Sequence, residues 1–172
     1  MKHLAVLFMF LTLQVCVLRT ASANFSTGVA AYKRGDFKIA FKVFKKSAQQ
    51  GHTGGQYNLG YMYYNGRGVP QDYVQAVKWW RKAADQGDAL AQSNLGRIYG
   101  DGQGVPQDYV QAVKWLRKAA KQGHADAQFG LLLNRDLVKV NAMYRKGLGV
   151  PKTKPGGEVV AQDRDAGPTR IR

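Results

Sequence analysis

Cysteine and glutamate are almost absent from this sequence of 172 residues. Cys16 is the only cysteine, and it lies in an apolar segment near the start of the chain. A lipoprotein would be acylated at Cys16, but Val15 does not suit the peptidase that cleaves before such a cysteine. If the segment is removed, the mature chain has no thiol. We then expect no disulfide, no cysteine nucleophile and no thiolate metal site.

Apolar runs long enough to cross a bilayer comfortably are missing as well. The longest run, residues 4–18, follows the basic residue Lys2 and ends in the small-residue segment 21–23. This order is typical of a secretory signal peptide, and we predict cleavage after Ala23. A buried N-terminal helix and a membrane anchor are the alternatives. We expect an exported chain, periplasmic or secreted, with no transmembrane span after cleavage.

Acidic residues are also few, with 11 Asp and Glu against 26 Lys and Arg and a formal net charge of +15. Residues 1–23 carry two basic residues and no acid, which leaves 24 minus 11, or +13, on the mature chain. Such an excess favours contact with an anionic surface or partner. Hydrophobic residues make up 45% of the chain, which is enough for a packed core.

An internal repeat of 36 residues dominates the rest of the sequence. Residues 68–79 recur without change at 104–115, and residues 73–92 match residues 109–128 at 16 of 20 positions. Self-similarity at this period is typical of a solenoid, in which each unit buries its apolar face against its neighbours. We therefore predict an all-α protein, an α/α solenoid (superhelix) of stacked helical hairpins.

Each repeat contains two predicted helices. Apolar residues at steps of three and four predict a helix over Asp72–Gln86 and its copy over Asp108–Gln122. Asp72 suits the N-cap, and Gly87 suits the left-handed position after the last turn. A shorter helix covers 91–99, and we expect its mid-helix glycine, Gly96, to permit close helix contact.

Three tryptophans lie on the longer helices of the repeats. We expect Trp80 and its equivalent Leu116 to fill the core between successive repeats. Trp79 and Trp115 fall at the flank of the apolar stripe, where they serve either as core residues or as ligand platforms.

The residues of one repeat form a recognisable pattern: Asn58, Leu59, Gly60, Tyr63, Gly66, Gly68, Val69, Asp72, Ala76, Trp79, Ala83, Ala84 and Gly87. This pattern resembles the Sel-1-like repeat, closely over 58–128 and more loosely over 25–51, where it is tetratricopeptide-like. The resemblance implies an α/α solenoid that binds proteins. Some exported bacterial relatives are linked to host-cell interaction or to β-lactam binding. Those relatives are rich in cysteine, so their disulfides and enzymatic activity are not carried over.

We predict the following organisation from these patterns. A signal peptide (1–23) precedes a repeat domain (24–151) and a disordered tail (152–172). The repeat domain comprises an opening helix pair (24–51), two repeats (52–87 and 88–123) and an irregular closing repeat (124–151). The closing repeat has nine extra residues, and we expect them to lengthen its helix rather than to form a loop.

No catalytic or metal-binding constellation is evident. His52 and His124 occupy equivalent turn positions, and no histidine pair has ligand spacing on one helix. We therefore predict no metal, no cofactor and no enzymatic activity.

Two groups of residues are candidates for binding. For a protein partner they are Asn58, Tyr61, Asn94 and Arg97 on the shorter helices. For an anionic surface they are Lys78, Arg81, Lys82, Lys114, Arg117, Lys118 and Lys121. An Asn amide that bonds its own helix, and a merely solvated basic face, are the structural alternatives.

The predicted function is an exported scaffold for protein–protein interaction, with host-cell or envelope partners. The alternatives are a hydrolase of cell-wall amides or β-lactams and a basic module for anionic surfaces. We expect no nucleic-acid partner, because the basic residues have few aromatic residues among them for base stacking.

Overall fold

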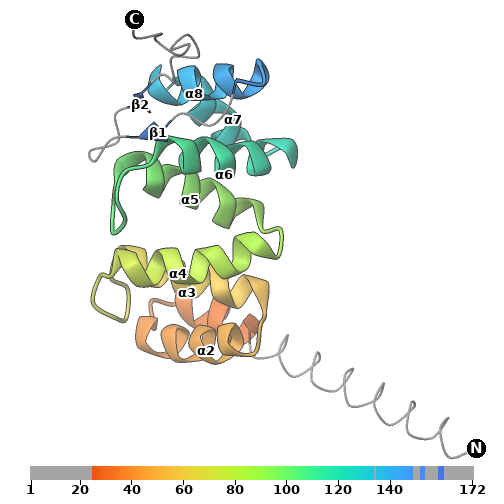
Figure 1. The fold of residues 1–172 in the computed structure, drawn as a ribbon. Coiled ribbons are helices and arrows are strands. Elements are labelled where there is room, and N and C mark those ends of the chain that lie inside the picture. Colours follow the sequence, from red (N-terminus) through yellow and green to blue (C-terminus); the bar gives the residue numbers. More distant parts are fainter. Residues whose placement is uncertain (1–24, 134, 149–151, 154–158, 161–172) are drawn as a thin grey trace, which may run out of the picture. The chain divides into compact units, whose positions relative to one another are not determined.

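The computed structural model describes residues 25–133, 135–148, 152–153 and 159–160 (Figure 1). The chain divides into two compact units, Met1–Asp88 and Ala89–Arg172, and we describe each unit by itself. The predicted signal peptide, residues 1–23, lies outside the described residues.

The described part of the first unit consists of helices joined by short turns. Its helices are an opening helix at 25–33, α2 (Phe37–Gln49), α3 (Thr53–Asn65) and α4 (Tyr73–Asp85). Helix α3 packs against both α2 and α4. The core contains Phe44, Leu59 and Met62, which are almost fully buried, and aromatic rings pack around its edge.

The second unit is built around one central helix. Its helices are α5 (Ala89–Asp101), α6 (Tyr109–Lys121), α7 (Ala125–Leu133) and α8 (Arg135–Arg145). Helix α6 packs against the other three. Its buried side chains, Val113 and Leu116, meet Leu131 and Val140 in the core.

The predicted ends of the longer helices are confirmed. The Asp72 carboxylate accepts a hydrogen bond from the Gln75 backbone N–H at 2.9 Å, and Asp108 caps α6 in the same way. Such caps satisfy backbone donors that lack a partner in the first turn. Gly87, after α4, has a φ of +95°, a conformation that favours glycine.

Glycines allow the two helices of each repeat to approach closely. A Cβ on Gly96 of α5 would lie 2.4 Å from Leu116 Cγ, and one on Gly60 of α3 would lie 2.6 Å from Trp80 Cδ1. Trp80 is fully buried and donates a hydrogen bond to the Tyr57 carbonyl at 3.1 Å. The predicted burial of Trp80 and Leu116 in the core and the predicted reason for Gly96 are therefore confirmed.

Paired glutamines form a second contact that recurs with the repeat. Gln86 Nε2 donates to Gln56 Oε1 at 2.7 Å in the first unit, and Gln122 Nε2 donates to Gln92 Oε1 at 2.9 Å in the second. Gln56 and Gln92 are each only 4% exposed. Buried amides need hydrogen-bond partners, so each bond joins the end of the longer helix to the shorter one before it.

The closing segment differs from the single lengthened helix that we expected. It forms two helices, since α7 ends at Leu133 and α8 begins at Arg135. Helix α8 packs against α6 as well as α7. Leu131 is buried in the core, whereas Leu132 is 75% exposed. Successive residues of a helix point about 100° apart, so burial of Leu131 leaves Leu132 outside.

Four residues of the predicted disordered tail are described. They form two short antiparallel strands, β1 (Lys152–Thr153) and β2 (Val159–Val160), with Lys152 opposite Val160. This pairing differs from the expectation for those four residues. The rest of the segment 152–172 lies outside the described residues.

Candidate functional site

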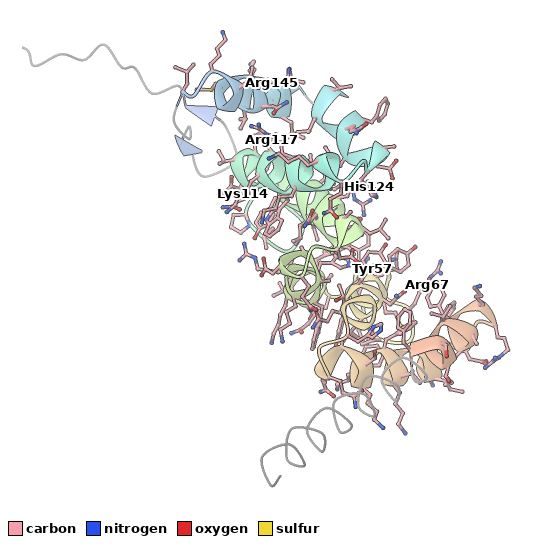
Figure 2. The ribbon with its side chains drawn as sticks, turned by 90° about the vertical axis from the view of Figure 1, so that its right-hand side faces the viewer. Tyr57, Arg67, Lys114, Arg117, His124 and Arg145 are labelled. Carbon is pink, nitrogen blue, oxygen red and sulfur yellow. The ribbon has the colours of Figure 1, made fainter. Side chains whose placement is uncertain are left out.

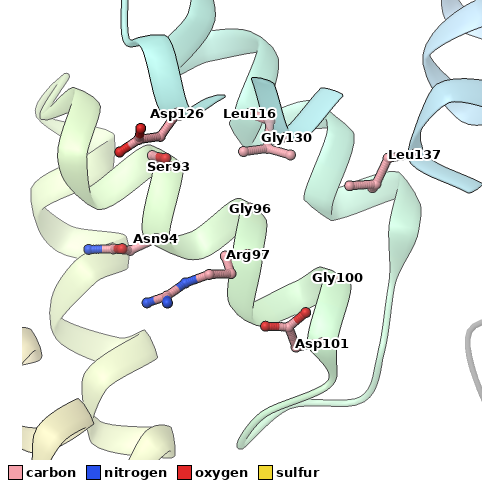
Figure 3. A pocket seen from close by; sticks show the side chains of 10 residues that line it. All are labelled: Ser93, Asn94, Gly96, Arg97, Gly100, Asp101, Leu116, Asp126, Gly130 and Leu137. Carbon is pink, nitrogen blue, oxygen red and sulfur yellow. The ribbon is translucent and has the colours of Figure 1, made fainter. Parts of the chain in front are cut away.

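A groove of about 460 Å³ lies in the second unit, lined by residues of α5, α6, α7 and α8 (Figure 3). Its floor includes Leu116 from α6 and Leu137 from α8. Three lining residues are glycines: Gly96, Gly100 and Gly130. A Cβ on Gly100 or Gly130 would meet nothing closer than 3.7 Å, so these two positions leave open space that a side chain would fill, whereas Leu116 fills the space beside Gly96.

Polar and charged side chains form the rim of this groove. Asn94, Arg97 and Asp101 follow one another at steps of three and four, so they lie along one face of α5. Asp126 comes from the first turn of α7, where a carboxylate is favoured by the helix dipole. The rim therefore offers one cation, two carboxylates and an amide that both donates and accepts.

Two of the predicted partner-binding residues, Asn94 and Arg97, are thus placed together in the groove. The sequence analysis did not select Asp101 or Asp126. Asp101 lies seven residues after Asn94, and this helical spacing was a usable signal. Asp126 occupies the position that Leu90 has in the preceding repeat. The repeat pattern therefore gave no signal for an acidic residue there.

The other two predicted partner-binding residues lie on α3 in the first unit. Asn58 Nδ2 donates to the Gly54 carbonyl at 2.8 Å, so the amide bonds its own helix. The Tyr61 ring lies 6.4 Å from the Tyr57 ring and 6.4 Å from the Tyr32 ring. Asn58 and Asn94 are equivalent in sequence, but Asn94 lines the groove of the second unit, whereas the Asn58 amide bonds its own helix.

The predicted anionic-surface residues occupy two helices in separate units. On α4 they are Lys78, Arg81 and Lys82, all exposed. On α6 they are Lys114, Arg117, Lys118 and Lys121, which line a shallow cavity of about 210 Å³. Figure 2 shows Lys114 and Arg117 on this helix.

The flanking tryptophans belong to the protein's own packing. Trp115 is 3% exposed, and Trp79 packs against the core of the first unit. The Lys118 ammonium lies 4.3 Å from the Trp115 ring centre, and Lys82 lies 4.6 Å from Trp79. These contacts favour the core interpretation over ligand platforms.

The two histidines are more than solvated turn residues. His52 Nδ1 accepts a hydrogen bond from the Gly55 backbone N–H at 3.2 Å and so caps α3, and its ring stacks 4.7 Å from Phe25. His124 is half-buried at the equivalent position before α7. Among the described residues, no three His, Cys, Asp or Glu side chains are grouped to hold a metal ion.

No helix in the described part of the chain has the length and apolar character that a bilayer crossing requires.

Comparison with known proteins identifies the repeats. Residues 22–52, 54–88 and 89–124 match the Sel1 repeat. The chain belongs to the Sel1 repeat family. The matches end at residue 124, so α7 and α8 lie beyond them.

Two solved Sel1-type structures are similar to the chain. One is c5321, a protective antigen of uropathogenic Escherichia coli strains with an SLR fold, at 40% identity and a TM-score of 0.61. The similarity covers 74% of this chain and 26% of that protein. The other is a Sel1 repeat protein of Oxalobacter formigenes, at 36% identity and a TM-score of 0.59, covering 76% of this chain and 48% of that protein.

Among curated proteins, the chain is 39% identical over 64 residues to DAP3-binding cell death enhancer 1 of Rattus norvegicus. That match covers 37% of this chain and only 13% of the rat protein. The predicted all-α repeat solenoid and the Sel1 resemblance are both confirmed. Sel1 repeat proteins generally act as scaffolds for protein–protein interaction and generally are not enzymes.

Proposed function

We propose that the chain is an exported Sel1 repeat scaffold that binds a protein partner through the groove of α5 and α7. The observation that carries this proposal is the groove itself, with its mixed polar rim above an apolar floor. Its volume of about 460 Å³ suits a short peptide segment better than a whole domain surface.

The rim chemistry favours an extended peptide. An Asn amide can pair with both groups of a peptide bond, and the Arg97 guanidinium can hold a carboxylate or a carbonyl. Asp101 and Asp126 add two acceptors for N–H groups or basic side chains. Leu116 and Leu137 provide an apolar contact for a partner side chain.

The export part of the proposal rests on residues 1–23, which have the order of charge, apolar run and small residues of a signal peptide. Export would give partners in the envelope or on a host cell access to the groove. The similar E. coli protein is a protective antigen of uropathogenic strains, which supports a partner outside the cytoplasm. The hydrolase alternative gains no support from the groove, since its described lining includes neither histidine nor cysteine.

The test compares two equivalent asparagines. The full chain and its variants are immobilised, partners are captured from envelope extracts and culture supernatant, and the affinity of each purified partner is measured. We expect Asn94→Ala and Arg97→Ala each to weaken binding about tenfold, a loss of about 1.4 kcal/mol. Asn58→Ala is the matched control, because its amide bonds Gly54 on its own helix. Equal affinities for the chain and both groove variants would disprove the role of this groove.

A second candidate function is a basic module for anionic surfaces. It is favoured by the four cations that line one cavity on α6 and by the net charge of +15. If the chain has this function, its binding to chemically unrelated anionic ligands weakens steeply as the salt concentration is raised from about 0.05 to about 0.5 M, because salt screens exposed charges. Binding that is insensitive to salt would exclude it.

A further inference from the structure

A second cavity of the second unit, about 350 Å³ in volume, is lined by α6, α7 and α8. It shares no lining residue with the groove. Three cationic residues line it, Arg117 and Lys121 from α6 and Arg145 from α8, and its described lining includes no acid. Figure 2 shows Arg117 and Arg145 on neighbouring helices.

Two of the three cations of this cavity are not neutralised by a carboxylate of the described residues. Neither Lys121 nor Arg145 forms an ion pair within the described part of the chain. Like charges that converge on one cavity repel one another, and a bound anion reverses the sign of that interaction. Guanidinium groups also match the geometry of phosphate oxygens.

Large apolar side chains project into solvent beside these cations. Leu132, which lines the cavity, is 75% exposed, and Phe129 is 60% exposed. Residues three apart are neighbours on a helix surface, so the two side chains form one apolar pair on α7. Water-exposed apolar residues next to a cluster of cations are the combination by which proteins bind the surface of an anionic membrane.

Each simpler ligand would leave part of this surface unused. A free phosphate would neutralise the cations and leave Phe129 and Leu132 in water. An apolar protein surface would cover those two side chains and leave Lys121 and Arg145 without a counter-charge. An anionic bilayer presents phosphates and the acyl boundary a few ångströms apart, and so matches both.

We propose that this face of α6, α7 and α8 docks on an anionic lipid bilayer. Lipid phosphates enter the cavity of Arg117, Lys121 and Arg145, and the side chains of Phe129 and Leu132 insert at the acyl boundary. Aromatic and apolar side chains are favoured at that depth. The inference rests on the second candidate function and names both its surface and the residues that insert.

The test is co-sedimentation of the full chain with vesicles of phosphatidylcholine alone or with 30% phosphatidylglycerol, at 0.1 M salt. We expect binding only to the anionic vesicles. One kcal/mol for each cation near the surface corresponds to about fivefold in affinity. Lys121→Gln with Arg145→Gln should therefore weaken binding at least tenfold. The matched pair Lys45→Gln with Lys46→Gln removes the same charge from α2 and should weaken it much less.

Insertion is tested by removing the apolar pair. Phe129→Ser with Leu132→Ser should weaken vesicle binding at least tenfold, because burial of apolar surface scales with the groups inserted. Ile39→Ser with Val74→Ser is the control, since both residues are exposed apolar positions in the first unit. Far-UV circular dichroism checks that each variant is folded.

The outcomes separate this inference from the function on which it rests. If Phe129→Ser with Leu132→Ser binds as well as the unchanged chain, docking by insertion is disproved, while a purely electrostatic anionic-surface function stands. If the chain binds neither kind of vesicle, both the membrane-docking inference and the anionic-surface function are disproved. Equal binding to the two kinds of vesicle would also refute the inference, because the cavity would then play no part.

Discussion

The contact between Gly96 and Leu116 gives the sharpest test of how the repeats pack. In Gly96→Ala, the new Cβ would lie 2.4 Å from Leu116 Cγ and 2.7 Å from Leu116 Cδ2. The backbone carbonyl oxygen of Ala112 lies 3.2 Å away, so the helix cannot simply slide along α6. Carbon atoms pack best at about 3.5–4.0 Å, so Leu116 or the helix has to move by more than 1 Å.

Two opposing effects set the magnitude. Alanine is favoured over glycine within a helix by about 1 kcal/mol. Overpacking in a well-packed core costs about 1–3 kcal/mol, and Leu116 is only 4% exposed, so it has little room to yield. We therefore expect a clash cost in the upper part of that range, about 2–3 kcal/mol, and a net loss of about 1–2 kcal/mol in the free energy of unfolding.

The same helix supplies the control. Gly100 lies one turn later in α5, and a Cβ there would meet only Ala112 Cβ, at 3.9 Å. Gly100→Ala should therefore gain about 1 kcal/mol from helix propensity alone. The two variants should differ by about 2–3 kcal/mol in urea unfolding followed by far-UV circular dichroism.

A double-mutant cycle with Leu116→Ala assigns the loss to this contact. The cost of Gly96→Ala should shrink by at least about 1 kcal/mol when Leu116 is already truncated. If Gly96→Ala is as stable as Gly100→Ala, or if the cycle shows no coupling, the close approach does not limit what this position accepts, and the packing argument is wrong.

Three further predictions concern polar side chains that are buried or half-buried. Ser47 Oγ is buried with no hydrogen-bond partner among the described residues, so Ser47→Ala should leave the free energy of unfolding, measured by thermal unfolding, unchanged or raise it by about 1 kcal/mol at most. Gln92→Ala should lower the free energy of urea unfolding by about 1–2 kcal/mol, because it removes the hydrogen bond from Gln122, and an undiminished free energy of unfolding would contradict this. Burial, with the nearby charge of Asp72 as a smaller cause, raises the pKa of Tyr63 above 10.0. The unfolded chain then ionises first, so stability is full below pH 10 and falls as the pH rises above it; Tyr63→Phe should lessen that fall in alkaline unfolding curves.

The anionic-surface and groove residues show where sequence reasoning reached its limit. The basic side chains of α6 were identified from the repeat, but Arg145 was not, because it lies beyond the repeated segment. Asn58 and Asn94 have the same place in the repeat. The Gly54 carbonyl accepts a hydrogen bond from the Asn58 amide, while Asn94 lines the groove of the second unit. A repeat pattern cannot distinguish them.

The sequence alone determined the helices, their caps and the way each repeat packs. These features depend on residues close in the chain, or on the same residues one period later, so that periodic apolar positions, Asp72 and Gly87 were sufficient signals. Tertiary structure decided the break between α7 and α8, the exposure of Leu132 and the pairing of Gln92 with Gln122. Each of these features depends on which residues from other helices contact a given side chain. Those contacts depend on how the helices pack in three dimensions, and the local sequence pattern does not determine that packing.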